Sequence, residues 1–299
     1  MTAEIEVQQP PLEEQLAWEA RYGRWAGIAA GLSAVLFLVS FVVELPALRA
    51  KAKNEAGTLR SVYDHSSSLV GASIAQAVGL FLMVGALIYL FRVTRYRRSQ
   101  TRGFLLALII IGPLLVGVTA VLASLELRHV AHQFHTLPAA QQTVKKAKDL
   151  VAAGPERVLG IISPISIIAF VGGLVMLNLN SIRAGVVSTF VGIVGIIGSV
   201  LFIVPVGPPQ LLTFFWLAFL AATFLDMWPG GRGPAWASGK AEKWPNMAEK
   251  RALARGEPLP ERPQRRPRGA PPPPPPPPDP EGDPSPSTSA RKRKRKKRR

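Results

Sequence analysis

Long runs of apolar residues, separated by short polar segments, fill the chain between positions 25 and 228. Crossing about 30 Å of hydrocarbon takes about 20 apolar residues in an α-helix. Each such run must be helical, because a helix satisfies its own backbone hydrogen bonds where no water is present. The pattern therefore predicts an all-α, polytopic transmembrane helix bundle with six spans. The six spans are predicted at 25–45, 68–91, 104–125, 158–177, 185–206 and 209–228.

Polar segments flank this bundle on both sides. The N-terminal segment, 1–24, is rich in glutamate and lacks the basic start of a signal peptide. The C-terminal segment, 229–299, holds nineteen of the 36 Lys and Arg residues, an unbroken proline run at 271–278 and a purely basic run at 291–299. Such a composition cannot bury a core, so we expect a disordered tail with a polyproline II rod at the proline run.

The average composition mixes these two parts. The chain has 299 residues, a net charge of +17 and only 18% charged residues, and it contains no cysteine. These figures exclude a soluble globular enzyme, a disulfide-built module and any cysteine-ligated metal centre. No catalytic signature is present, so we do not expect an enzyme, although the sequence leaves that question open.

The orientation in the membrane follows from the basic residues. With six spans, both termini lie on the same side, together with the short loop between the second and third spans. That loop is bounded by a dense arginine cluster, which is too costly to bury in lipid and is typical of the cytosolic side. We therefore predict a multi-pass protein of the cell (inner) membrane with both termini cytosolic. The cluster consists of Arg92, Arg95, Arg97, Arg98 and Arg102.

The densest group of chemically active side chains follows the third span. Glu126, His129, His132 and His135 recur every three residues, and imidazole with carboxylate suits Zn, Cu, Ni or Fe. Three residues advance a helix by about 300°, so neighbours share a face whereas the first and last members point in opposite directions. A metal site on two of these residues, completed by His65, is one interpretation. A pH-sensing or merely interfacial histidine cluster is the other.

Few polar groups lie inside the predicted spans. Gln76 is the one amide near the middle of a span, and it is interpreted as an interhelical hydrogen bond or as a substrate contact. Pro113 and Pro164 interrupt the hydrogen bonding of the third and fourth spans, as in helices that frame transporter sites. The middle of the bilayer holds no ionisable group, which argues against a proton-driven or sodium-driven transporter.

The last two predicted spans carry the only resemblance to other proteins. The stretch that begins Asn180-Ser-Ile-Arg183-Ala-Gly-Val-Val-Ser-Thr-Phe, with Phe215-Trp216-Leu217 after a proline-bearing turn, resembles uncharacterised bacterial six-span membrane proteins. Those families are domains of unknown function. The resemblance implies a helical membrane bundle and supplies no catalytic residue.

Two functions remain open from the sequence. The first is a non-enzymatic envelope sensor or scaffold component, and the alternative is a small transporter or lipid-handling permease. The expected partners are the lipid bilayer and, through 291–299, anionic lipid headgroups. Nucleic acid or a protein is the other partner that such a tail would suit. No cofactor is expected unless the histidine cluster holds a metal ion.

Overall fold

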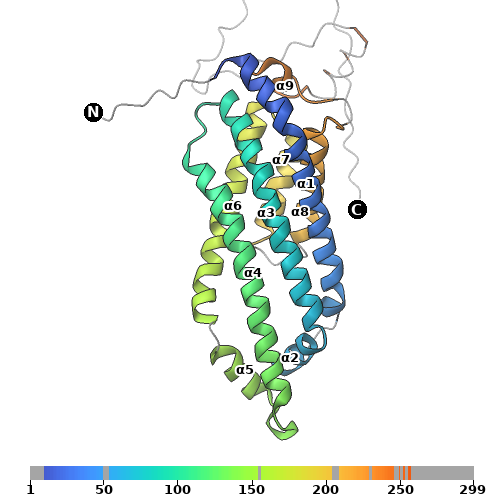
Figure 1. Ribbon diagram of the computed structural model, residues 1–299, viewed down its shortest axis with the longest axis vertical. Helices are drawn as coiled ribbons and strands as arrows, with labels where there is room; N and C mark the ends of the chain where they lie inside the picture. Colours follow the sequence, from blue (N-terminus) through green and yellow to red (C-terminus); the bar gives the residue numbers. More distant parts are fainter. Residues whose placement is uncertain are drawn as a thin grey trace, which may run out of the picture. The chain divides into compact units, whose positions relative to one another are not determined.

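The regular secondary structure of the described residues is entirely helical (Figure 1). The structure is a computed structural model, and it describes residues 10–49, 54–153, 156–203, 209–228, 231–245 and the single positions 249, 252, 255 and 256. The α-helices are α1 (Leu12–Arg49), α2 (Glu55–Asp64), α3 (Ser66–Arg97), α4 (Phe104–Thr136), α5 (Val144–Ala153), α6 (Glu156–Ala184), α7 (Thr189–Val200), α8 (Pro209–Phe224) and α9 (Ala235–Ser238), with a 3₁₀ turn, η1, at Ala139–Gln141.

The chain divides into two units, Met1–Met247 and Ala248–Arg299. All of these helices belong to the first unit. In the second unit the described positions show a turn in which the Arg255 amide donates to the Ala252 carbonyl. The proline run at 271–278 and the basic run at 291–299 lie outside the described residues.

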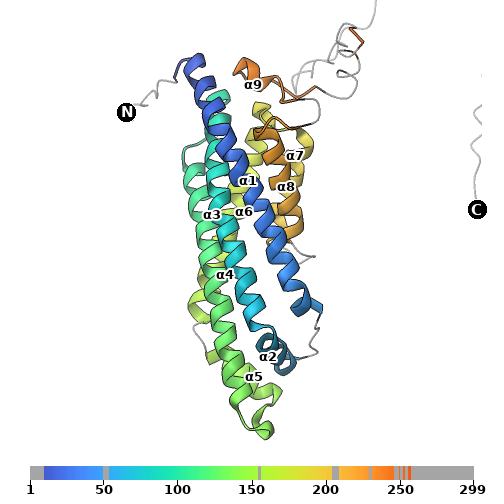
Figure 2. The ribbon, with the colours of Figure 1, turned by 45° about the vertical axis from the view of Figure 1, so that its right-hand side comes forward.

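Six helices of the first unit form a closed ring. Along it α1 packs against α3, α3 against α4, α4 against α6, α6 against α7, α7 against α8, and α8 again against α1. Figures 1 and 2 show α7 and α8 beside the half of the ring that carries the start of α1, while α2 and α5 lie at the opposite end. The half of the ring at the start of α1 therefore contains all six helices, whereas the other half is built mainly from α1, α3, α4 and α6.

Among the residues that the structure describes, four helices are long and apolar enough to cross a membrane. They are Leu12–Ala47, Ser66–Arg97, Phe104–Thr136 and Ile162–Ala184. Large apolar side chains point outward along them, among them Leu32 at 52% exposure, Ile111 at 53% and Ile168 at 63%. Lipid contact explains that exposure, because isolated soluble domains rarely leave such continuous apolar faces open.

The prediction of six spans is not confirmed. The segments 185–206 and 209–228 do contain helices, but α7 has 12 residues and α8 has 16. At 1.5 Å per residue these helices are about 18 Å and 24 Å long, whereas the hydrocarbon is about 30 Å thick. Each of the other four predicted segments lies inside one of the long helices.

Small residues bring the helices of the ring together. A Cβ added at Gly27 would lie 2.7 Å from the Leu225 side chain, and one added at Gly112 would lie 2.7 Å from the Phe170 Cα. The first contact joins α1 to the end of α8, and the second joins α4 to α6. The Gly27/Gly31 step in the first predicted span thus serves helix packing, which is how small residues act in membrane bundles.

A second, smaller core lies beyond the lipid-facing part of the bundle. The helix α4 has 33 residues, or about 50 Å, so it extends well past one face of the hydrocarbon. Its last turns pack against α2 and α5 through buried Leu59, Phe134 and Ala147. The Asn54 side chain caps α2 by accepting from the Gly57 amide at 2.9 Å.

Candidate functional site

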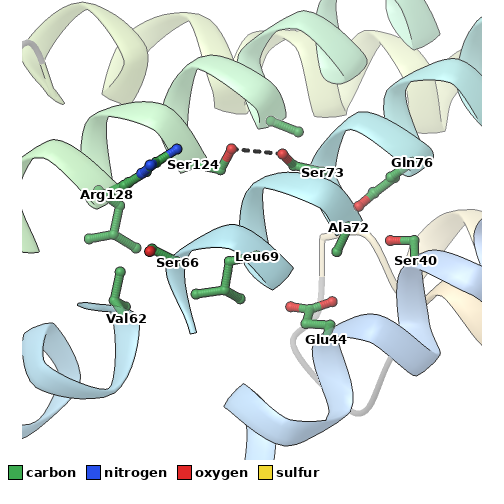
Figure 3. A pocket seen from close by; sticks show the side chains of 12 residues that line it. Ser40, Glu44, Val62, Ser66, Leu69, Ala72, Ser73, Gln76, Ser124 and Arg128 are labelled. Carbon is green, nitrogen blue, oxygen red and sulfur yellow. Dashed lines mark hydrogen bonds between the residues drawn. The ribbon is translucent and has the colours of Figure 1, made fainter. Parts of the chain in front are cut away.

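A polar cavity lies inside the bundle, near the end that carries α2. It has a volume of about 200 Å³, and α1, α3 and α4 supply most of its walls, with α2 at one edge (Figure 3). The polar residues that line it are Ser40 and Glu44 from α1, Ser66, Ser73 and Gln76 from α3, and Ser124 and Arg128 from α4.

The helix positions of these residues explain why they converge. Ser66, Ser73 and Gln76 are spaced at seven and three residues, so they share one face of α3. Ser124 and Arg128 are four residues apart and share a face of α4. The two faces meet where the Ser73 and Ser124 hydroxyls form a hydrogen bond of 2.7 Å.

Ser40 is the deepest polar group in the lining. Its residue is only 1% exposed, and its hydroxyl has no hydrogen-bond partner among the described residues. A buried hydroxyl without a partner costs roughly 1–3 kcal/mol. Since Ser40 lines the cavity, water or a bound solute can supply the missing partner there.

The cavity is lined by two side chains of opposite charge, Glu44 and Arg128. Figure 3 shows the Arg128 guanidinium on one side of the cavity and the Glu44 carboxylate on the other, where Ser40 and Gln76 also lie, with the hydrogen-bonded pair of Ser73 and Ser124 between the two sides. The lining therefore offers hydrogen-bond donors and acceptors as well as opposite charges. Such a surface suits a small polar or dipolar solute better than an acyl chain.

The cavity does not continue through the bundle. Phe37 on α1 follows Ser40 one turn deeper, and Leu80 and Met83 on α3 follow Gln76 one and two turns deeper. All three side chains are fully buried at 0% exposure. Apolar packing thus separates the cavity from the end of the bundle where α1 begins.

Gln76, predicted as a substrate contact or an interhelical hydrogen bond, is part of this lining. The other lining residues were not singled out from the sequence. Isolated serines are common in membrane helices, so they carry no signal until the helices are placed side by side. The spacing within each helix was nevertheless visible in the sequence. Ser40 and Glu44 share a face of α1, and Ser73 and Gln76 share a face of α3.

The predicted metal ligands lie on the last turns of α4, and none of them lines this cavity. His129 and the Gln133 side chain are 2.8 Å apart, and the His135 ring stacks on Tyr63 with centroids at 3.8 Å. His132 lies 6.0 Å from the same tyrosine ring. In the part of the chain that the structure describes, no group of three His, Asp or Glu side chains is placed to hold one metal ion.

The spacing along α4 and the position of His65 explain why no such group forms among the described residues. Glu126 and His135 stand on opposite sides of α4, as the 300° steps require. His65 stays in its own segment, with its Nδ1 2.9 Å from the Ser61 carbonyl. The histidines on this face take part in ring stacking and in hydrogen bonds to neighbouring side chains.

A second polar cluster lies at the other end of the bundle and corrects the expectation that the whole arginine cluster stays out of the protein interior. The Arg97 side chain is 0% exposed and forms an ion pair with Glu19, whose side chain is 4% exposed. Its Nη1 and Nη2 donate to the two carboxylate oxygens at 2.6 and 2.9 Å. Its Nε donates to the Ala235 carbonyl at 2.8 Å.

This cluster joins three parts of the chain that are far apart in sequence. Gln15 also donates to the Glu19 carboxylate at 2.9 Å, and Tyr89 donates to the Glu19 carbonyl at 3.1 Å. The Arg97 guanidinium lies 5.4 Å from the centre of the Trp236 ring. Burial is tolerated because every side of the guanidinium group meets a carboxylate, a carbonyl or an aromatic face.

Comparison of the chain with known protein families, with curated protein sequences and with solved structures finds no match.

Proposed function

We propose that this protein is a membrane-embedded sensor that binds a small polar solute in the cavity between α1, α3 and α4. The observation that carries the proposal is the buried, unpartnered hydroxyl of Ser40 in a lining that also holds Glu44 and Arg128. Polar groups inside membrane helices are expensive, so a cluster of them around a cavity is a functional site by default.

A sensor needs a connection between its binding site and its output. The helix α1 supplies one, because it carries Ser40 and Glu44 at the cavity and Glu19 in the buried ion pair. The two positions are about 32 Å apart along the helix, since they are separated by 21 residues at 1.5 Å each. A solute that shifts α1 changes the packing at the side of the termini. We propose that the tail, 229–299, reports that change through its basic run at 291–299, which binds anionic headgroups.

The solute can be sought by thermal unfolding of the purified protein in detergent. The probes are glycine as a zwitterion, ethylamine as a cation and acetate as an anion. A solute at 100 times its Kd stabilises the folded state by about 2.7 kcal/mol. We expect glycine to raise the midpoint of the wild type and of Gln133→Leu, a control on an exposed face of α4, but not of Gln76→Leu or Arg128→Gln. Equal shifts in all four proteins would contradict the site.

A small transporter remains the second function, because Gln76 lines the cavity and Pro113 and Pro164 lie inside α4 and α6. Transport requires that the packing around Phe37 and Leu80 opens. Proteoliposomes loaded with the solute that stabilises the protein would separate the two functions. Stabilisation without flux supports a sensor, and flux that Gln76→Leu abolishes supports a transporter.

We further propose a topology of four spans with a re-entrant hairpin made by α7 and α8. The outer ends of the hairpin are joined on one side of the bundle, where Trp236 donates to the Val186 carbonyl at 2.9 Å and Trp244 to the Gly185 carbonyl at 2.7 Å. Gly185 has a positive φ of 72°, and a Cβ there would collide with the Glu242 carbonyl. A re-entrant pair and two full spans both leave the termini on one side, which we place in the cytosol of the cell membrane.

The cysteine-free chain permits a direct test of this topology. Single cysteines at Ala140, Ile203 and Ser287 are treated in intact cells with an impermeant maleimide. We expect labelling of Ala140→Cys alone. Labelling of Ile203→Cys as well would show that the hairpin crosses the membrane and that the protein has six spans. Labelling of Ser287→Cys would reverse the orientation.

A further inference from the structure

A second cavity, unrelated to the polar one, lies between the first half of α1 and the second half of α3. Its volume is about 420 Å³, and the exposed side chains of Tyr22 and Trp25 are among those that line it. We propose that it holds one anionic phospholipid, whose phosphate is bound by Arg92 and whose acyl chain runs along the groove. The residues that carry the inference are Trp18, Tyr22, Trp25 and Ala29 on α1 and Gly85 and Arg92 on α3.

The depth of this groove matches the headgroup region. Trp25 is 69% exposed and Tyr22 is 45% exposed, and the outward apolar face of α1 follows with Ile28 and Leu32. Exposed tryptophan and tyrosine at the start of an apolar face mark the boundary between headgroups and hydrocarbon. A ligand in the groove therefore has one end among headgroups and the other among acyl chains, which only an amphipathic molecule satisfies.

Arg92 supplies the recognition of an anion. Its guanidinium carbon lies 4.5 Å from the centre of the Trp18 ring, so the aromatic face fixes the plane of the group. The side chain is exposed, and none of the ion pairs among the described residues involves it. A guanidinium group held in one plane can bind two phosphate oxygens at once.

The electrostatic surroundings favour a net negative lipid over a zwitterionic one. Two acidic side chains of α1 lie close to Trp18 in the sequence. Glu19 points away from the groove and is neutralised by Arg97 at 2.6 Å, and the exposed Glu14 lies one turn before Trp18, away from Tyr22 and Trp25. The neighbouring Arg95 is exposed and adds a second positive charge on the same end of α3. A lipid whose headgroup keeps a net charge of −1 gains from both arginines, whereas the cationic group of a choline lipid would be repelled.

Small residues leave room for the acyl chain. A Cβ added at Gly85 would meet no atom within 4 Å, so the groove is open at this point on α3. Ala29 forms the opposite wall on α1. Small residues such as Ala29 and Gly85 often serve helix packing in membranes. Here no described helix covers them, and Arg92 at the end of the groove favours an anionic lipid.

Native mass spectrometry of the full-length protein, titrated with phosphatidylglycerol or phosphatidylcholine, tests the proposal. We expect wild type to bind the first phosphatidylglycerol about tenfold more tightly than phosphatidylcholine, a difference of about 1.4 kcal/mol. Arg92→Gln should remove that preference, and Gly85→Leu should weaken the binding of both lipids. Gly172→Leu is the matched control, since its Cβ also meets no atom within 4 Å, and it should bind as wild type does.

Three results would overturn the proposal. They are an unchanged lipid preference in Arg92→Gln, wild-type binding in Gly85→Leu, and equal loss in Gly172→Leu. Inorganic phosphate at millimolar concentration forms a separate arm, and displacement of the lipid by phosphate alone would assign the arginine to a free anion. The basic run at 291–299 is present in every variant, so differences between variants report on the groove.

Discussion

Replacing Arg97 by methionine removes the positive half of a buried ion pair and leaves the Glu19 carboxylate inside the protein. Arg97 makes four hydrogen bonds: two to the carboxylate at 2.6 and 2.9 Å, one to the Ala235 carbonyl at 2.8 Å and one to the Val93 carbonyl at 3.1 Å. After the change, the Gln15 amide at 2.9 Å is the one hydrogen-bond donor from the described residues that still faces the carboxylate. Breaking a buried pair by removing one partner costs about 3–5 kcal/mol.

That cost is a large share of the roughly 5–15 kcal/mol by which proteins are stable. Glu19→Gln should cost a similar amount, because it leaves Arg97 as the uncompensated charge. The double variant, Glu19→Gln with Arg97→Met, buries no charge, so we expect it to be more stable than the sum of the single changes by at least 2 kcal/mol. Arg95→Gln is the control at an exposed arginine two positions away, and it should stay within about 0.5 kcal/mol of wild type.

The assay is reversible unfolding by SDS in mixed micelles, followed by tryptophan fluorescence and circular dichroism. The four proteins of the cycle and the control are measured under one set of conditions. Single changes that cost less than 1 kcal/mol, or a double variant whose loss equals the sum of the single losses, would refute the reasoning. The ion pair would then contribute no more than a surface pair does.

Two further predictions concern the packing of the ring and the cap made by α2 and α5. Gly112→Ala places a Cβ 2.7 Å from the Phe170 backbone, so it should destabilise the protein by about 1–3 kcal/mol in the same SDS assay, whereas Gly71→Ala, with nothing within 4 Å, should not. The backbone amide at the start of α2 lowers the pKa of the Glu55 carboxyl, and Lys148 at 3.4 Å lowers it further. The stabilisation of α2 is therefore present above the ordinary pKa of a glutamate and is lost as the pH falls through the lower folded value. The protection factors of the α2 amides, which are corrected for the intrinsic pH dependence of exchange, should fall in acid for wild type, and Glu55→Gln should remove that fall; an identical profile in both proteins would contradict the assignment.

The sequence predicts the helices well because the bilayer leaves the backbone so few choices. Apolar runs such as 68–91 and 104–125 must be helical whatever their neighbours are. Hydropathy gives no information on how deep a helix goes, so α7 and α8 were interpreted as full spans although they have 12 and 16 residues. The helix α7 ends at Val200 and is followed by a turn at 201–203, whose residues are as apolar as those of the helix, so the sequence does not mark this end.

The polar groups were harder to predict, because their partners are distant in the chain. Arg97 was placed outside the bundle on its charge alone, and the carboxylate that makes its burial tolerable belongs to Glu19, 78 positions earlier. Ser40 was passed over for the same reason, since a single serine becomes part of a site only when α3 and α4 lie beside it. The spacing of the histidine cluster, by contrast, already indicated that Glu126 and His135 point apart. The structure places both residues on the α-helix α4, where this spacing puts them on opposite sides.

The central claim is that a polar cavity inside the membrane admits small solutes from the side of α2. The most direct test is the reaction of Ser40→Cys in intact cells with a small, charged methanethiosulfonate reagent. Ser33→Cys is the matched control on the same helix: Ser33 is 0% exposed, donates to the Gly79 carbonyl at 2.7 Å and lies outside the cavity lining. The account predicts that Ser40→Cys reacts and that Ser33→Cys does not. An unreactive Ser40→Cys, in a protein whose Ala140→Cys variant is labelled, would contradict it.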